Sequence, residues 1–198
     1  MVWANDIMKD AYLSYSANIG DHISYGDIND YLSSFSQYKG IDLVIGGPPC
    51  QGFSVAGKMD ISDSRSQLIW SYDKAIKSIL PKAFIMENVK ALGTLKRWEL
   101  VRDELLCKLQ NIGYSVGFCI LNASDFDVPQ ARERIFIIGF KGDSPLPIDL
   151  NTMIQSYRNK SKSVRETLSI LDKAGVGNNT KTCNAKITIA SNPILRKS

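Results

Sequence analysis

The chain has 198 residues, 44% of them hydrophobic and 22% charged, and a formal net charge of +4. That apolar fraction supports a buried core and excludes wholesale disorder, and the length suits one domain, with or without a fragment of another. No apolar run approaches the roughly 18 residues of a membrane span, and the start of the chain lacks a signal-peptide pattern. We therefore expect a soluble cytoplasmic protein with no membrane partner.

The charge is distributed unevenly along the chain. Residues 1–140 carry 14 basic and 16 acidic side chains, whereas residues 141–198 carry 10 basic and 4 acidic ones. The C-terminal quarter is therefore the part better suited to face a polyanion, although a solvated basic tail explains the same charge equally well.

Cysteine and histidine usage argues against a metal site. The cysteines at positions 50, 107, 119 and 183 form no C-x-x-C pair, and the chain has a single histidine, His22. Zinc ligands come in closely spaced groups, so we expect no metal. Without a secretory signal we also expect no disulfides, so any special role of a cysteine must come from its local setting.

Strand-like and helix-like segments alternate along the chain. In order, the predicted elements are a helix over 7–19, a strand over 41–45, a helix over 68–80, a strand over 83–86, a helix over 98–112, strands over 115–121 and 134–140, and a helix over 163–171. This alternation predicts an α/β fold with a doubly wound, largely parallel sheet. The residue composition changes after Lys141, where the alternation of predicted strands and helices stops. This change predicts a domain over 1–142 and a connector with the start of another region over 143–198.

Two predicted strand ends carry groups that could do chemistry. The segment Gly46–Ser54 (GGPPCQGFS) follows one strand and places the thiol of Cys50 on a stretch stiffened by two prolines. Glu87 and Asn88 follow the next strand directly. Parallel strands would bring Cys50 and Glu87 to one rim of the sheet, as a nucleophile with an acid group. The alternative is that Cys50 fills a small apolar space and Glu87 caps the next segment.

Two further segments contain residues suited to binding phosphate. Residues 52–58 (GFSVAGK) match the start of a phosphate-binding loop, but Met59 replaces the hydroxyl that would hold Mg²⁺, so we reject nucleotide hydrolysis. In an extended entry to the strand over 134–140, Arg132 and Arg134 would project from one face and Glu133 from the other. Two neighbouring guanidinium groups suit phosphate or carboxylate, although a solvated, ion-paired strand end is the commoner fate of such a triplet.

Several of these segments resemble the motifs of one enzyme family in order and spacing. GGPPCQGFS (46–54), MENV (86–89) and QARERIFIIG (130–139) resemble the fourth, sixth and eighth motifs of the cytosine-5 DNA methyltransferases. DSRSQL (63–68) resembles the fifth motif, and WAND (3–6) and GDI (26–28) resemble the second and third. The resemblance covers nearly all of residues 1–140 and implies the sheet of the S-adenosylmethionine-dependent methyltransferases.

The resemblance implies covalent catalysis on a cytosine flipped out of double-stranded DNA. Cys50 would be the thiolate that adds to carbon 6 of the ring, which makes carbon 5 nucleophilic. Glu87 would hold or protonate the ring nitrogen and the exocyclic amine, and Asn88 would brace the loops. Arg132 and Arg134 would contact the flipped nucleotide and help to position Cys50 and Glu87.

The resemblance also assigns binding residues and a cofactor, S-adenosyl-L-methionine. Its implied cofactor-binding residues are Asp6, Ile7, Asp27, Ile28, Pro49 and Leu68, and its implied DNA-binding residues are Gln51, Ser54 and Gln130. Asp6 would bind the ribose hydroxyls, and Ile7 would lie against the adenine. Ile7 and Leu68 are equally well explained as ordinary core residues of a first helical turn.

The sequence departs from the family at both ends. Before Asp6 there is no glycine-rich turn for the methionine part of the cofactor, so we expect the first, central strand to be missing and both of its neighbours to expose edges. Residues 191–196 resemble the approach to the target-recognition region, and that region and the last two motifs are not present. The chain therefore resembles a truncated member.

Three hypotheses follow. The first is a cytosine-5 DNA methyltransferase of a bacterial restriction-modification system, working as a fragment or split chain with a complementing methyltransferase chain. The second is a non-catalytic remnant that serves as a DNA or protein interaction module. The third is the same chemistry on transfer RNA. The form of the GGPPCQGFS segment, with Ser54, is more typical of the DNA branch.

Overall fold

The computed structural model describes residues 1–49, 68–142, 150–159 and 161–169. Its elements in chain order, with η marking a 3₁₀ helix, are β1 (Ala4–Asp6), α1 (Lys9–Asn18), β2 (Ile23–Tyr25), η1 (Ile28–Tyr38), β3 (Leu43–Gly46), α2 (Leu68–Ile79), β4 (Ala83–Val89), α3 (Ala91–Thr94), α4 (Lys96–Gln110), β5 (Tyr114–Asn122), η3 (Ala123–Asp125), β6 (Glu133–Lys141), α5 (Leu150–Gln155) and α6 (Val164–Ser169).

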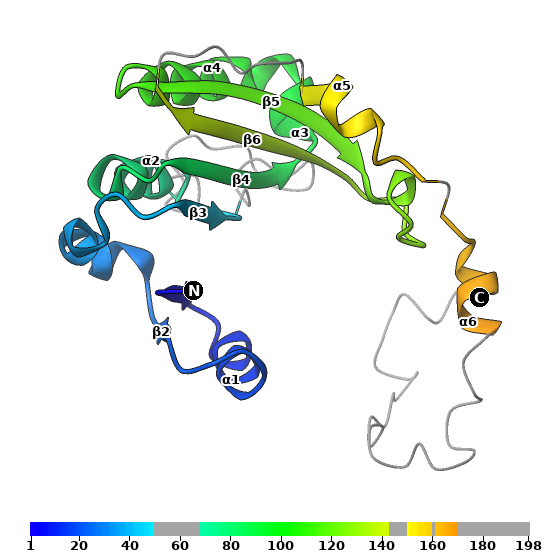
Figure 1. Cartoon of the computed structure of the whole chain (residues 1–198), viewed down its shortest axis with the longest axis horizontal. Coiled ribbons are helices and arrows are strands. Elements are labelled where there is room, and N and C mark those ends of the chain that lie inside the picture. The colour runs from blue at the N-terminus through cyan, green and yellow to red at the C-terminus, as the bar shows by residue number, and fades with distance from the viewer. Residues whose placement is uncertain (50–67, 143–149, 160, 170–198) are drawn as a thin grey trace.

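The strands of the described residues form two separate sheets (Figure 1). The order β3-β4-β6-β5 makes a four-stranded sheet, and β1 and β2 make a two-stranded one. β1 runs parallel to β2 and β3 parallel to β4, whereas β6 is antiparallel to both β4 and β5. The predicted α/β class is confirmed. The sheet is mixed because the short connection over 123–132 reverses the chain between β5 and β6, where a parallel pairing would need a longer crossover.

The four-stranded sheet and the helices α2 and α4 enclose the main core. Leu105 and Leu109 of α4 are fully buried, as their spacing predicts. Ile69, Tyr72 and Ile76 of α2 are buried in the same core. The other buried members of this core are Phe84, Met86, Leu92, Trp98, Tyr114, Ile135 and Ile137.

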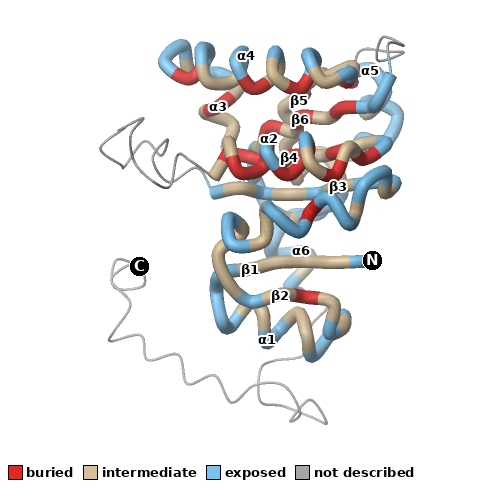
Figure 2. The backbone as a smooth tube through the Cα atoms, turned by 90° about the vertical axis from the view of Figure 1, so that its left-hand side faces the viewer, coloured by how far each residue is buried: buried red, intermediate tan, exposed pale blue. Residues whose placement is uncertain are grey.

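The two-stranded sheet, α1 and η1 form the other end of the described chain. Phe35 of η1 is only 1% exposed and packs with Ala75 and Ile79 of α2 and with Trp3, so it links this end to the larger sheet. α1 buries none of its residues. In Figure 2 the buried segments gather along the four-stranded sheet and its helices, whereas β1 and α1 are intermediate or exposed.

Most predicted elements are confirmed with small shifts at their ends, and one boundary is wrong. The strand predicted over 83–86 continues to Val89, because β6 goes on pairing with it through Asn88↔Ile135 and Val89↔Arg134. Glu87 and Asn88 therefore lie inside β4 rather than after it. The sequence prediction did not include β2 or η1, since three residues of strand and a 3₁₀ helix leave little periodicity to detect.

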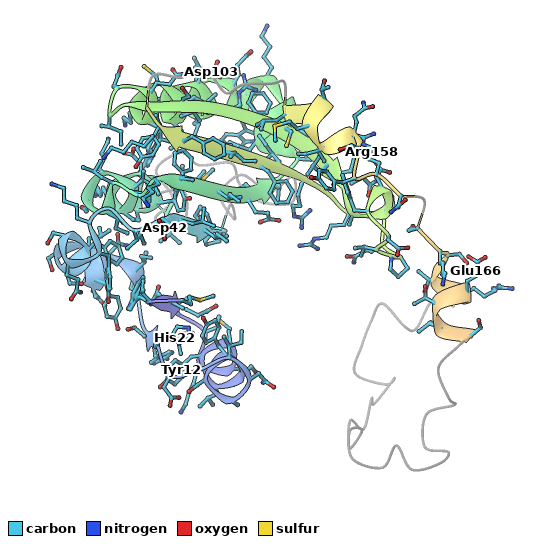
Figure 3. All side chains as sticks on the ribbon, in the orientation of Figure 1. Tyr12, His22, Asp42, Asp103, Arg158 and Glu166 are labelled. Carbon is cyan, nitrogen blue, oxygen red and sulfur yellow. The ribbon has the colours of Figure 1, made fainter. Side chains whose placement is uncertain are left out.

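The segment after residue 149 lies partly against the larger sheet. α5 packs on β5, with Leu150 buried at 7% exposure. Farther along, the Asn159 N–H donates to the Asp125 carbonyl oxygen at 2.8 Å, and Arg158, labelled in Figure 3, pairs with the Asp125 carboxylate at 3.7 Å. The connector predicted from 143 onward is thus followed by a segment that returns to the sheet.

Candidate active site

An ion pair joins the two central strands of the larger sheet near the carboxyl end of β4. The Arg134 Nε of β6 donates to the Glu87 Oε1 of β4 at 2.7 Å, and the two side chains are 24% and 38% exposed. The pairing register places Glu87 opposite Phe136 and Val89 opposite Arg134. The carboxylate is therefore held by a fixed guanidinium while part of it remains accessible.

Glu87 and Arg134 line a hollow of about 350 Å³. Its other lining residues are Leu121, Ala123, Phe126, Arg132 and Phe136. Two guanidinium groups and one carboxylate thus meet between apolar walls. Ligand sites commonly combine apolar walls with a few convergent polar groups, and this hollow has that composition.

The backbone of Arg132 is fixed from two directions. Asn122 Oδ1 accepts from the Arg132 N–H at 3.0 Å, and the Ala123 N–H donates to the Arg132 carbonyl oxygen at 3.0 Å. Glu133 lies on the opposite face from its neighbours and accepts two hydrogen bonds from Lys90 Nζ, at 2.7 and 2.8 Å. The alternation predicted for an extended entry to β6 is observed.

The start of the segment after β3 lies beside Glu87. The Asn88 side chain, 3% exposed, donates from Nδ2 to the Pro48 carbonyl oxygen at 3.0 Å. A Cβ built on Gly47 would lie 3.4 Å from Glu87 Oε2. The segment that carries Cys50 therefore leaves the sheet next to the carboxylate. Cys50 itself lies outside the described residues, as do Gln51 and Ser54.

Tyr72 requires the first glycine of this segment. A Cβ on Gly46 would come within 2.6 Å of Tyr72 Cε2. The Tyr72 hydroxyl donates to the Ile85 carbonyl oxygen at 3.1 Å, so the ring cannot easily move aside. Burial raises the pKa of Tyr72 and keeps this donor protonated.

Two of the predicted cofactor-binding residues, Asp6 and Asp27, lie at or just after the carboxyl ends of β1 and β2. Asp6 Oδ1 accepts from the Met8 N–H at 2.7 Å, and Asp27 Oδ1 accepts from the Asn29 N–H at 2.8 Å. A backbone hydrogen bond of 3.2 Å from Gly26 to Asp6 holds the two strand ends together. Two carboxylates that share one rim fit the ribose hydroxyls of an adenosine.

The other four predicted cofactor-binding residues differ in how far they are buried. Ile7 is 60% exposed, whereas Ile28 packs in the cluster around Phe35. Pro49 is exposed and Leu68 is half-buried at the start of α2. Within the described residues no glycine-rich turn lies beside β1 to receive the methionine part of S-adenosylmethionine. The residues present therefore fit the adenosine part of that cofactor.

Phe126 and Phe136 line the hollow, although the sequence analysis did not predict them as site residues. Gln130, which was predicted to bind DNA, is exposed and does not line the hollow. The period-two alternation of β6 could have placed Phe136 on the face of Arg134. Phe126 lies in the connection after β5, where no periodicity exists. Lys90, the partner of Glu133, gave no signal because 43 residues separate them.

The α/β fold is the Rossmann-like fold of the methyltransferases among its structural neighbours. The described chain aligns with the crystal structure of the S. pombe Dnmt2 methyltransferase with a TM-score of 0.68 and 24% identity, over 87% of this chain and 53% of that one. Residues 1–195 match the family described as C-5 cytosine-specific DNA methylase. The chain belongs to this family, whose members use S-adenosyl-L-methionine as methyl donor.

Curated relatives agree with this family. The chain is 41% identical over 150 residues to the type II methyltransferase M.DdeI of Desulfomicrobium norvegicum, covering 71% of this chain and 35% of that relative. It is 33% identical over 192 residues to M1.HphI of Haemophilus parahaemolyticus, covering 93% of this chain and 50% of that relative. The chain thus spans half or less of the length of these two bacterial relatives.

Two kinds of feature are absent from the described residues. No group of three or more His, Cys, Asp or Glu side chains there could hold a metal ion. Among the same residues no helix is both long enough and apolar enough to cross a membrane.

Proposed function

We propose that this chain supplies the catalytic residues of a DNA (cytosine-5) methyltransferase, which methylates carbon 5 of a cytosine flipped out of double-stranded DNA. The observation that carries the proposal is the hollow at the end of β4, where Arg134 holds Glu87 and the segment leading to Cys50 begins beside it. A pyrimidine ring in this hollow would meet a carboxylate, two guanidinium groups and apolar walls.

In the proposed reaction Cys50 is the nucleophile. Its thiolate forms a bond to carbon 6, and the electron pair of the ring double bond makes carbon 5 nucleophilic. S-adenosyl-L-methionine, when bound, would supply the methyl group to carbon 5, with its C–S bond breaking and S-adenosylhomocysteine as the leaving group. Loss of the carbon 5 proton to water then returns an electron pair to the ring, expels the thiolate and restores the double bond.

Glu87 and the two arginines stabilise charge in this scheme. The Glu87 carboxyl group would hydrogen-bond the ring nitrogen and the exocyclic amine, where negative charge collects after thiolate addition. Arg134 fixes the direction of that carboxylate through the 2.7 Å contact, and Arg132 would meet the flipped nucleotide. Asn88 holds the segment before Cys50 through the Pro48 carbonyl. Base flipping costs a few kcal/mol, which these contacts must offset.

The cofactor would be held where β1 and β2 end. Asp6 and Asp27 each have one carboxylate oxygen engaged in a backbone cap, and the other has no partner among the described residues. These free oxygens would accept from the ribose hydroxyls. Ile7, Ile28, Pro49 and Leu68 would then line the adenine side of the same site.

The proposal requires polypeptide beyond these 198 residues. We assign residues 1–142 to the catalytic domain and 143–198 to the connector and the start of target recognition. Gln51, Ser54 and Gln130 would contact the DNA, and a complementing segment would complete the cofactor site and read the sequence. The reaction would take place in the cytoplasm of a bacterium, since both curated relatives are bacterial.

Covalent trapping tests this proposal. The chain is mixed with duplex DNA containing 5-fluorocytosine and labelled S-adenosylmethionine, alone and with candidate complementing chains. Fluorine at carbon 5 blocks the final elimination, so we expect a stable adduct in at least one mixture. Cys50→Ser should abolish the adduct, whereas Cys107→Ser, which changes an exposed cysteine, should not.

Other results would redirect the proposal. No adduct in any mixture, together with unchanged DNA binding by Cys50→Ser, would mean a non-catalytic DNA-binding module. An adduct that forms with fluorinated transfer RNA in preference to duplex DNA would mean that RNA is the substrate.

A further inference from the structure

A second ion pair joins the ends of β4 and β6, on the face of the sheet opposite to the hollow. Lys90 Nζ donates to both carboxylate oxygens of Glu133, at 2.7 and 2.8 Å. The β4–β6 ladder ends at Val89↔Arg134, and the next pair in the same register is Lys90 with Glu133. Side chains that lie directly opposite each other in an antiparallel pair interact closely. The ion pair therefore closes the end of the ladder that carries Glu87 and Arg134.

The backbone is anchored on both sides of this ion pair. The Lys90 carbonyl oxygen accepts from the Gly93 N–H at 2.9 Å and from the Thr94 hydroxyl at 3.2 Å, so the first turn of α3 holds it. Glu133 pairs with Asn122 at the end of β5, and β6 lies between β4 and β5 (Figure 1). Because neither backbone is a mobile end, the two side chains lose less freedom when they pair.

Hydrogen bonds continue from Glu133 to the hollow. The Glu133 carbonyl oxygen accepts from Arg134 Nη1 at 2.8 Å, and Arg134 Nε donates to Glu87 Oε1 at 2.7 Å. A guanidinium group is planar and rigid, so contacts at two of its nitrogens fix the orientation of the whole group. A continuous chain of polar contacts thus runs from Lys90 through Glu133 and Arg134 to the Glu87 carboxylate.

The entry to β6 is held differently on its two sides. Toward β5 it is held by the backbone of Arg132, whose N–H donates to Asn122 Oδ1 and whose carbonyl oxygen accepts from the Ala123 N–H, both at 3.0 Å. Toward β4 the described ladder ends at Arg134, and the contact beyond it is the Lys90–Glu133 ion pair. Loss of this ion pair would therefore loosen the entry to β6 on the side of Glu87.

We propose that Lys90 and Glu133 are positioning residues for the chemistry of the hollow. Neither of them lines the hollow, and they act by holding the Arg134 guanidinium against Glu87. The ion pair thereby sets the direction of the carboxylate that would hydrogen-bond the flipped base. This consequence rests on the proposed function, whereas the link from Lys90 to Glu87 does not depend on it.

Stability alone would not reveal this role. The Lys90 and Glu133 side chains are 43% and 46% exposed, and ion pairs of that exposure contribute little to the free energy of unfolding. Substitution of either residue should therefore leave the fold nearly as stable as before. The expected effect is local and lies at Arg134.

The Arg134 Nε–Hε group reports the link directly, without DNA or cofactor. Its NMR signal in the full chain, assigned by its loss in Arg134→Lys, gives the rate at which the Nε proton exchanges with water. Glu133→Gln keeps the shape of the side chain and removes its charge, so we expect exchange to be faster by about threefold or more. The matched control is Glu104→Gln, because Glu104 pairs with Lys108 at 2.7 Å and is 54% exposed on α4. The control should leave the Arg134 exchange rate unchanged.

Exchanging the two charges separates positioning from a general loss of structure. Lys90→Glu places two carboxylates opposite each other and should speed the Arg134 exchange, whereas Lys90→Glu combined with Glu133→Lys should restore the slow rate. Urea denaturation checks that the variants are equally stable. Unchanged exchange in Glu133→Gln, equal acceleration in Glu104→Gln, or no restoration in the double variant would overturn the proposal.

Covalent trapping on 5-fluorocytosine DNA measures the consequence for the reaction. In Glu133→Gln we expect the rate of adduct formation at saturating DNA to fall by about threefold or more, with an unchanged Kd for DNA. Faster Arg134 exchange with an unchanged adduct rate would overturn the positioning role, and a weaker Kd with an unchanged rate would assign the ion pair to DNA contact instead. If the unsubstituted chain forms no adduct in any mixture, the proposed function fails, and the exchange rates still decide the link to Glu87.

Discussion

The two sheets of this molecule differ in how completely they are built. The four-stranded sheet is continuous from β3 to β5, covered by α2 and α4, and it holds both halves of the Glu87–Arg134 pair in place. The two-stranded sheet carries the carboxylates suited to an adenosine, but its helix α1 buries no residue. The hollow beside Glu87 is therefore formed within the described residues, whereas the two-stranded sheet pairs with no further strand among them.

The difference follows from the sequence pattern of the helices as well as from strand pairing. The apolar residues of α2 gather on one face and seven of its residues are buried, whereas those of α1 gather on no one face and none is buried. α2 also lies on a sheet with strands on both sides of β4, whereas α1 lies beside a sheet of two strands among the described residues. Two strands make a marginal platform on their own, so α1 has neither an apolar face nor a wide sheet against which to bury one.

The largest expected effect is a difference between the two regions in how much a substitution lowers the free energy of unfolding. Phe84 is fully buried in edge-to-face contact with Tyr114 at 5.2 Å, so Phe84→Ala should lower the free energy of unfolding by about 3–5 kcal/mol. Leu13→Ala on α1, where the side chain is 51% exposed, should change it by less than about 0.5 kcal/mol. Urea denaturation measures both, and similar losses would contradict the comparison.

A smaller effect is expected at two adjacent glycines, Gly46 at the end of β3 and Gly47 directly after it. Gly46→Ala forces a Cβ against Tyr72 at 2.6 Å and should destabilise the fold by about 1–3 kcal/mol. Gly47→Ala meets Glu87 Oε2 at 3.4 Å, so it should change stability little and instead reduce adduct formation. Melting temperatures and the trapping assay separate the two. The reverse order of stability would show that Tyr72 does not fix this segment.

The smallest expected effect is an alkaline weakening of the larger sheet. Burial raises the pKa of Tyr114 to about 12, and its hydroxyl donates to the Pro81 carbonyl oxygen at 2.6 Å. An unfolded tyrosine loses its proton near pH 10, so between about pH 10 and 12 the unfolded state binds fewer protons and stability falls as pH rises. Melting temperature against pH should show this fall, and Tyr114→Phe should reduce its slope. An equal slope in the variant would assign the effect to other groups.

Periodicity and strand ends predicted much of this fold and of its site. The spacing of Leu105 and Leu109 predicted the buried face of α4, and the alternation Arg132, Glu133, Arg134 predicted which side chains share a face. The end of β4 was missed because its last residues are strand only through pairing with β6, and Glu87 is polar. Phe126 was missed because its place in the hollow depends on a turn, not on a repeat.

Residue-resolved amide exchange of the chain alone, followed in rising urea, tests the contrast between the two regions most directly. We expect the amides of β4 and β6 to exchange only through global unfolding, and those of β1 and β2 to exchange through a local opening that depends little on urea. That result would establish that the four-stranded sheet is a stable unit and that the two-stranded sheet opens independently of it. Exchange of β1 and β4 with the same opening free energy and the same urea dependence would contradict it, because both would then belong to one cooperative unit.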